Sequence, residues 1–201
     1  MIRVLLAEDQ AMVRGALAAL LSREPDIEVV AEVARGDEVV EAAQAAQPDV
    51  ALLDIEMPGG GGLAAAAALR TVLPSCRTVI LTTFGRSGYL QRAMESGAVG
   101  FLLKDAPAAE LALALRRVMA GERVVDPDLA LSALSEGRNS LTPREREVLS
   151  ASLFGASLAE IAAQLVLSEG TVRNHLSTAM QKLGAQNRVE AARLAEQKGW
   201  L

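Results

Sequence analysis

The stretch DVALLDIEMPGGGG, residues 49–62, ends an apolar run on one carboxylate, Asp54, and then turns. The segment DVALLD predicts a buried strand, because a short apolar run bounded by turn signals is typical of a parallel sheet. Met57-Pro58 and the four glycines that follow end this strand, since proline and glycine favour turns. An acid at this place could be a nucleophile, a metal ligand or a turn residue.

Apolar segments of similar length lie on both sides of this stretch, and helical patterns separate them. We expect five strands, at residues 2–7, 27–34, 49–54, 78–83 and 99–104, with helices at residues 11–22, 36–47, 63–73, 89–95 and 107–119. Strands that alternate with helices predict an α/β fold in which helices cover both faces of a five-stranded parallel sheet. In such a fold the functional residues lie at the carboxyl ends of the strands.

The tail of the chain has helical patterns and no strand signal. Thr142 and Glu145, and again Ser157 and Glu160, have the spacing of a capping box. Ser168 precedes a helix expected at residues 169–183, Gly184 ends it, and VEAARLAEQKGW forms a last helix. These signals predict a small all-α domain of four helices that contains a helix-turn-helix.

Charge and composition divide the chain in the same way. Residues 1–137 hold 12 basic and 19 acidic residues, a net charge of −7, whereas residues 138–201 hold 8 and 6, a net charge of +2. We therefore expect a domain at residues 1–121, a linker at 122–140 with one short helix capped by Asp126, and a second domain at 141–201. One cysteine and the lack of an apolar run near ~20 residues predict a cytoplasmic protein without disulfides.

Polar residues follow the apolar strands where these end. Glu8 and Asp9 follow the first strand, Asp54 ends the third, Thr82 lies at the end of the fourth and Lys104 ends the fifth. Three acids at one edge of a sheet favour a hard divalent cation with oxygen ligands, Mg²⁺. Beside such a cation a carboxylate can attack phosphorus and form an aspartyl phosphate. Each residue alone has a simpler interpretation, since such acids often form turns or caps and a lysine there is usually solvated.

The segments LLAEDQ, DVALLDIEMPG, VILTTF and GAVGFLLKD resemble the receiver domain of two-component response regulators. The resemblance implies a flavodoxin-like (CheY-like) fold and a sensor histidine kinase as partner. It implies that Asp54 is the phosphoacceptor, that Asp9 binds the metal directly, and that Glu8 binds it through water. The main-chain carbonyl of Glu56 would also face the metal.

The resemblance further implies that Thr82 and Lys104 contact the phosphoryl group. Phe101 lies where receivers place a switch aromatic, and core packing is its alternative role. This chain departs from the common pattern at two places, because Glu8 stands where an aspartate is usual and Asp105 where many receivers have proline. The glycines after Pro58 predict a loop at residues 57–63 that is mobile without phosphate and orders on phosphorylation.

The segments LTPREREVL and SEGTVRNHLSTAMQKLG resemble the LuxR-type DNA-binding domain. The whole chain thus resembles the NarL/FixJ family, and AEDQ, TTFGRSGYLQRA, GTVRN and QKGW are most similar to its DesR branch, whose members partner membrane-embedded kinases. On helix 169–183 we expect a buried stripe of Val172, Leu176, Met180 and Leu183. By family position, base contacts fall to Arg173, Asn174 and Ser177, and phosphate contacts to Thr171, Lys182 and Arg188.

These features predict a transcription regulator in which phosphorylation of Asp54 promotes homodimerisation and binding to paired half-sites of double-stranded DNA. A net charge of +2 on the DNA-binding domain predicts weak binding by one copy. Two dimer faces are open: residues 11–22 with 107–119, or the fourth helix with the fifth strand. One alternative is a receiver that acts without phosphorylation through protein contacts. Another is an aspartyl-phosphate phosphatase, but nothing here resembles its second catalytic acid, so we expect no enzyme.

Overall fold

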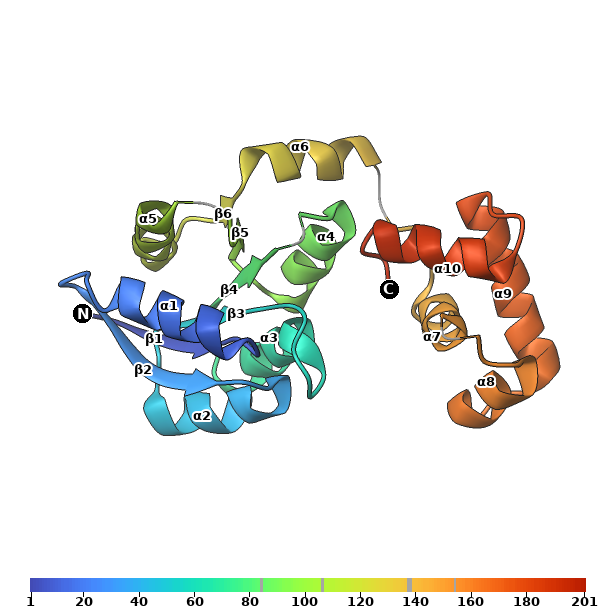
Figure 1. Cartoon of the computed structure of the whole chain (residues 1–201), viewed down its shortest axis with the longest axis horizontal. Helices are drawn as coiled ribbons and strands as arrows, with labels where there is room; N and C mark the ends of the chain where they lie inside the picture. The colour runs from blue at the N-terminus through green and yellow to red at the C-terminus, as the bar shows by residue number, and fades with distance from the viewer. Residues whose placement is uncertain (84, 106, 137–138, 154) are drawn as a thin grey trace. The chain divides into compact units, whose positions relative to one another are not determined.

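The computed structural model describes residues 1–201 except 84, 106, 137–138 and 154. The chain forms two compact units, one built on a sheet and one made of helices (Figure 1). The first contains all six strands of the described chain, and the second contains the four C-terminal helices. In the described chain no helix is long and apolar enough to cross a membrane.

The first unit is a parallel sheet of six strands in the order β2-β1-β3-β4-β5-β6. The strands are β1 (Ile2–Ala7), β2 (Ile27–Val33), β3 (Val50–Leu53), β4 (Arg77–Thr82), β5 (Gly100–Leu103) and β6 (Val124–Val125). This confirms the parallel α/β class but corrects the expected number of strands from five to six. The additional strand β6 lies in the segment expected to be a linker and pairs with β5. Two residues carry no strand periodicity, so only the pairing with β5 defines this strand.

Helices cover both faces of the sheet (Figure 1). The covering helices are α1 (Ala11–Leu21), α2 (Val39–Ala46), α3 (Gly61–Val72), α4 (Ser87–Ser96) and α5 (Ala108–Met119), with a short 3-10 helix η1 (Gly36–Glu38) before α2. Helix α6 (Pro127–Glu136) follows β6 in the linker segment. Leu21 of α1 and Leu115 of α5 share one core with Leu52 and Val79 of the sheet. Every residue of β3 is buried, which explains its unbroken apolar sequence.

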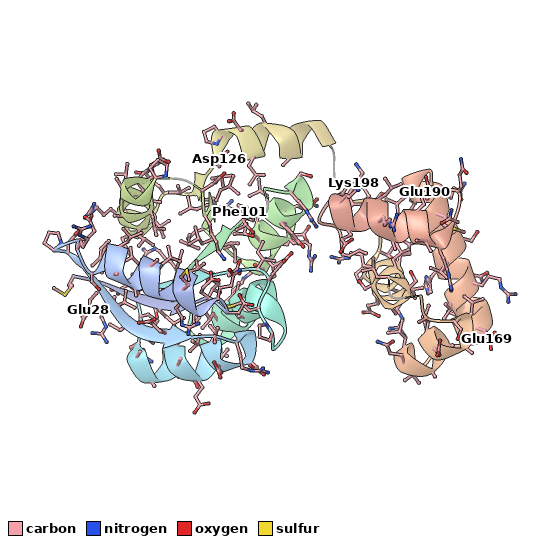
Figure 2. All side chains as sticks on the ribbon, in the orientation of Figure 1. Glu28, Phe101, Asp126, Glu169, Glu190 and Lys198 are labelled. Atoms are coloured by element: carbon pink, nitrogen blue, oxygen red, sulfur yellow. The ribbon has the colours of Figure 1, made fainter. Side chains whose placement is uncertain are left out.

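The linker helix begins as its sequence predicts. The Asp126 carboxylate accepts a hydrogen bond from the Leu129 N–H at 3.0 Å, and Pro127 is the first helical residue of α6. Figure 2 labels Asp126 at this end of the helix. A side-chain cap and a first-turn proline therefore define this start locally.

The second unit consists of α7 (Pro143–Ser152), α8 (Leu158–Leu165), α9 (Glu169–Leu183) and α10 (Arg188–Gln197). Both predicted capping boxes are present, Thr142 with Glu145 and Ser157 with Glu160. The Ser168 side chain caps α9, and Gly184 ends it in the left-handed conformation. The four-helix prediction is thus confirmed, and α8 and α9 form the helix-turn-helix.

The turn between α8 and α9 contains an unfavourable residue. Val166 ends α8 with φ +54° and is 89% exposed. The left-handed region costs an L-residue about 1–2 kcal/mol, and a β-branched side chain is among the least tolerant of it. The left-handed conformation of Val166 ends α8, and it strains the backbone at this residue.

We predict that Val166→Asn stabilises the second unit by about 1 kcal/mol, because asparagine tolerates positive φ. Val189→Asn is the control, since Val189 is also exposed but lies within the regular α-helix α10. Urea unfolding followed by fluorescence of Trp200, the single tryptophan of the chain, measures both changes. An equal change in the two variants would show that conformation at Val166 carries no strain.

Candidate functional site

The ends of the strands bring the predicted site residues together. The Asp54 N–H donates to the Ala7 carbonyl at 2.9 Å, so the residues after β1 and β3 are neighbours. The Lys104 N–H donates to the Thr82 carbonyl at 2.9 Å, so the ends of β4 and β5 are neighbours as well. Parallel pairing thus places residues that are distant in sequence at one edge of the sheet.

Three carboxylates gather at this edge. Glu8, Asp9 and Asp54 each offer one oxygen, and these oxygens all lie within 4.8 Å of one another. Glu8 is 1% and Asp54 5% exposed, whereas Asp9 faces solvent. The cluster is therefore buried on the side of Glu8 and Asp54 and open on the side of Asp9.

Lys104 neutralises part of this charge. Its ammonium Nζ lies 2.5 Å from Glu8 Oε2 and 3.0 Å from Asp54 Oδ2. Burial works against the charged ammonium, but its hydrogen bonds to Glu8 and Asp54 outweigh burial and raise the pKa of Lys104. Lys104 is thus a permanent cation at neutral pH.

The donor set fits a hard divalent cation. One lysine cannot balance three carboxylates, and carboxylate oxygens are the ligands that Mg²⁺ prefers. The second oxygen of Asp54, Oδ1, accepts a hydrogen bond from the Ile55 N–H at 2.8 Å, which fixes the plane of the carboxylate. The side chains that could hold the cation are Glu8, Asp9 and Asp54, and the contribution of the Glu56 carbonyl stays a prediction.

Thr82 lies at the end of β4, whereas Phe101 is the second residue of β5 and pairs with Ile80; both are covered. Thr82 is 1% exposed at the end of β4, and Phe101 in β5 is fully buried. Figure 2 shows Phe101 inside the sheet-containing unit. Core packing of Phe101 is therefore observed, and its switch role stays a prediction, as does the phosphoryl contact of Thr82.

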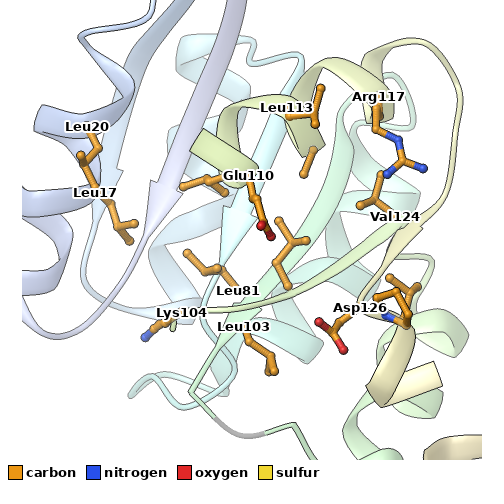
Figure 3. Close-up of a pocket in the computed structure, with 15 residues that line it drawn as sticks. Leu17, Leu20, Leu81, Leu103, Lys104, Glu110, Leu113, Arg117, Val124 and Asp126 are labelled. Atoms are coloured by element: carbon orange, nitrogen blue, oxygen red, sulfur yellow. The ribbon is translucent and has the colours of Figure 1, made fainter. Parts of the chain in front are cut away.

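A separate cavity of about 580 Å³ lies beside β5 and α5. Seven of its fifteen lining residues are leucine, including Leu81, Leu103 and Leu111. Figure 3 shows that Lys104 contributes to this lining while its amino group points away from the leucine side chains. The three clustered acids do not line this cavity, but Lys104 lines it and also pairs with Glu8 and Asp54, so the cavity adjoins the carboxylate site.

Helix α9 presents a polar face. Arg173, Asn174 and Ser177 are exposed, while Val172 and Leu176 are buried between them. Met180 and Leu183 are only partly buried, and Ala179 completes the buried stripe. The residues expected to contact bases therefore all lie on the accessible side of the helix.

The residues expected to contact phosphates are differently placed. The Thr171 hydroxyl lies 2.8 Å from that of Ser168 at the start of α9, and Arg188 is half-buried as the first residue of α10. Lys182 Nζ lies 3.0 and 2.8 Å from the two carboxylate oxygens of Glu145. Lys182 therefore has a partner within its own domain, and a phosphate contact by this residue stays a prediction.

Sequence reasoning identified Glu145 as a helix cap and missed its second role. One Glu145 oxygen accepts the Thr142 N–H at 2.8 Å while the same carboxylate binds Lys182. Burial raises the pKa of Glu145, but the Lys182 and Thr142 hydrogen bonds outweigh it and lower the pKa below its usual value. The sequence indicates that Glu145 caps α7. It contains no signal that Lys182 of α9 binds the same carboxylate.

Fold and site together define a protein that joins a receiver domain to a helix-turn-helix domain. The protein-family model of the response regulator receiver domain matches residues 4–116. The protein-family model described as bacterial regulatory proteins, luxR family, matches residues 139–195. The chain belongs to the two-component response regulators with a LuxR-type DNA-binding domain.

Relatives of this class match over the full length of the chain. The transcriptional regulatory protein DesR of Bacillus subtilis (strain 168) is 47% identical over 200 residues, with 100% of this chain and 99% of that protein covered. The response regulator RamR of Streptomyces coelicolor is 40% identical over 200 residues, covering 100% and 98%. The crystal structure of the response regulator ChrA, from a heme-sensing two-component system, is 35% identical with a TM-score of 0.59, covering 100% and 98%.

We predict that Glu145→Gln lowers the free energy of unfolding by about 2 kcal/mol at neutral pH, because the ammonium of Lys182 loses its charged partner. A carboxyl whose pKa is lowered by folding stabilises above its unfolded pKa, about 4.3, and this contribution is lost as pH falls through the lower folded pKa. The difference between wild type and variant should therefore shrink in acid.

Glu147→Gln is the matched control, since Glu147 forms an exposed pair with Arg144 on the same helix. Such a pair contributes at most about 1 kcal/mol. Urea unfolding at neutral and acid pH, followed by Trp200 fluorescence, measures both variants. A difference between wild type and Glu145→Gln that does not change with pH would contradict this role of the carboxylate.

Proposed function

We propose that a sensor histidine kinase phosphorylates Asp54, and that the phosphorylated chain dimerises and binds paired DNA half-sites to control transcription. The observation that carries this proposal is the position of Asp54, a 5% exposed carboxylate held by Lys104 beside two further acids. The relatives that are named as transcriptional regulators support a role of this chain in the control of transcription.

The residues of the site suit attack of a carboxylate on phosphorus. An oxygen lone pair of Asp54 forms the new O–P bond while the N–P bond to the donor histidine breaks and its electron pair stays on the imidazole. When bound, Mg²⁺ offsets the negative charge of the phosphoryl oxygens. Lys104 already touches Asp54, so its ammonium can transfer from the carboxylates to a phosphoryl oxygen as charge develops there.

Phosphorylation then acts as a population switch. A phosphoryl group that binds Lys104 and Thr82 stabilises one receiver conformation, and a ligand shifts an equilibrium by its differential affinity for the two states. Mg²⁺ would be held by Glu8, Asp9, Asp54 and the carbonyl of Glu56. The family matches, at residues 4–116 and 139–195, support a receiver at residues 1–121 and a DNA-binding domain at 141–201. Of the segment 122–140 between them, β6 belongs to the sheet of the receiver.

We expect the full chain, incubated with acetyl phosphate and Mg²⁺, to gain one phosphoryl group in intact-mass measurement, and Asp54→Asn to gain none. Asp105→Asn is the control, because Asp105 is an exposed acid beside Lys104 that does not belong to the cluster. Light scattering should show dimers only where the mass has increased.

Two outcomes would contradict the proposal. Asp54→Asn that dimerises and binds DNA as phosphorylated wild type does would favour a receiver that acts without phosphorylation. Sustained hydrolysis of a phosphomonoester over many turnovers would favour a phosphatase.

DNA binding is assigned to the exposed face of α9, where Arg173 and Asn174 are free of the domain's core. Arginine suits the acceptor pair on the guanine edge, and asparagine suits adenine. A net charge of +2 over residues 138–201 is a small electrostatic contribution, so two copies on adjacent half-sites are expected to bind far more tightly than one.

We predict that Arg173→Ala weakens binding to a selected DNA site by about 1–3 kcal/mol and relaxes preference at one base position. Arg193→Ala removes the same charge from the exposed surface of α10 and controls for net charge. Gel-shift titration of the phosphorylated chain at one fixed salt concentration measures both. Equal weakening by the two variants, with sequence preference unchanged, would remove Arg173 from base contact.

A further inference from the structure

The loop that leaves Asp54 is fixed by hydrogen bonds on both sides of Glu56. The Ile55 carbonyl accepts from the N–H groups of Met57 at 3.2 Å and Gly62 at 3.1 Å. The Pro58 carbonyl accepts from the Gly36 N–H at 2.8 Å. Glu56, the proposed main-chain metal ligand, therefore lies between two fixed carbonyls, and one of them is held from η1.

The contact between η1 and this loop is made by backbone on backbone. A methyl group at Gly36 would lie 2.8 Å from the Gly61 carbonyl oxygen, 2.9 Å from the Gly59 carbonyl oxygen and 2.9 Å from the Gly61 nitrogen. None of these atoms belongs to a flexible side chain that could move aside. Any residue other than glycine at this position must therefore displace the loop or η1.

The loop side of the contact has the same requirement. Gly59, Gly60 and Gly61 have φ of +79°, +94° and +75°, a conformation that other residues rarely adopt. A Cβ at Gly59 would lie 2.3 Å from an oxygen of Asp37 in η1. That carboxylate ends a side chain that can move, so Gly59 requires glycine through its positive φ, whereas Gly36 requires it through contact with backbone.

We propose that Gly36 is a positioning residue for the phosphorylation site: through Pro58 it fixes the backbone of Glu56, and so the geometry offered to Mg²⁺. This rests on the function proposed above. Gly36 touches neither the carboxylate cluster nor a reacting atom. The argument is geometric, since Mg²⁺ requires near-octahedral oxygens at about 2.1 Å and tolerates little displacement. Pro58, which Gly36 holds, is two residues from Glu56.

The test is the Mg²⁺ affinity of the full chain without any phosphodonor, measured from amide chemical shifts of Asp9, Asp54 and Glu56 during titration with MgCl₂. Gly36→Ala should weaken Mg²⁺ binding about tenfold, the lower end of what loss of a supporting contact around a metal site costs. Gly59→Asn disturbs the same contact from the loop side with a residue that tolerates positive φ, and should act in the same direction.

Two controls separate positioning from loss of stability. Gly15→Ala adds a methyl group that meets nothing within 4 Å, and should leave Mg²⁺ affinity unchanged. Leu21→Ala removes a fully buried side chain from the core under α1, and should lower Tm without changing Mg²⁺ affinity.

Wild-type Mg²⁺ affinity in Gly36→Ala and Gly59→Asn would overturn the inference, and so would equal weakening in Gly36→Ala and Leu21→Ala. A wild-type chain that binds no Mg²⁺ would overturn it as well. If the wild-type chain binds Mg²⁺ and Gly36→Ala does not, but acetyl phosphate leaves Asp54 unmodified, the proposed phosphorylation fails while the positioning role of Gly36 is supported.

Discussion

Lys104 Nζ lies 2.5 Å from Glu8 and 3.0 Å from Asp54, and without this cation two buried carboxylates would face each other at the end of the sheet. Two carboxylates that lie close together repel one another. Lys104, the residue directly after β5, pairs with both of them and offsets this repulsion. The shorter of the two contacts is made with Glu8. The parallel pairing of the strands makes this arrangement possible, because it brings the carboxyl ends of β1, β3 and β5 to the same side of the sheet.

The helical unit also depends on a buried carboxylate that is paired with a lysine. Glu145 is 4% exposed, and its one carboxylate both caps α7 and holds Lys182 of α9. A buried charge is tolerated only when it is paired and hydrogen-bonded. The pair links α9 to α7, so the exposed face of α9 belongs to a helix that is held in place within its own domain. Lys182, which is predicted to contact DNA phosphates, has a carboxylate partner within its own domain, and the phosphate contact stays a prediction.

The glycines at residues 59–62 show how one composition supports two interpretations. As a sequence they indicate a mobile loop, because glycine has the largest backbone entropy to lose. In the structure three of them have positive φ, and a Cβ at Gly62 would lie 2.0 Å from the Asp54 carbonyl oxygen. The structure also shortens the loop predicted at residues 57–63, because Gly61 and Gly62 already belong to α3. Each glycine therefore meets a steric requirement of the loop or of the start of α3, which is a sufficient reason for the run whatever its mobility.

The sequence by itself determined what depends on neighbours along the chain. The capping boxes at Thr142 and Ser157, the bounds of α9, the cap of α6 at Asp126 and the parallel α/β class follow from local hydrogen bonds and apolar periodicity. It also placed Glu8, Asp9, Asp54, Thr82 and Lys104 at one edge, because strand ends of a parallel sheet coincide. Only the tertiary structure decided the partners of Lys104 and Lys182, the sixth strand and the contact of Gly36 with the loop. Those contacts join segments far apart in sequence, and no local pattern encodes a distance between two side chains or two stretches of backbone that only folding brings together.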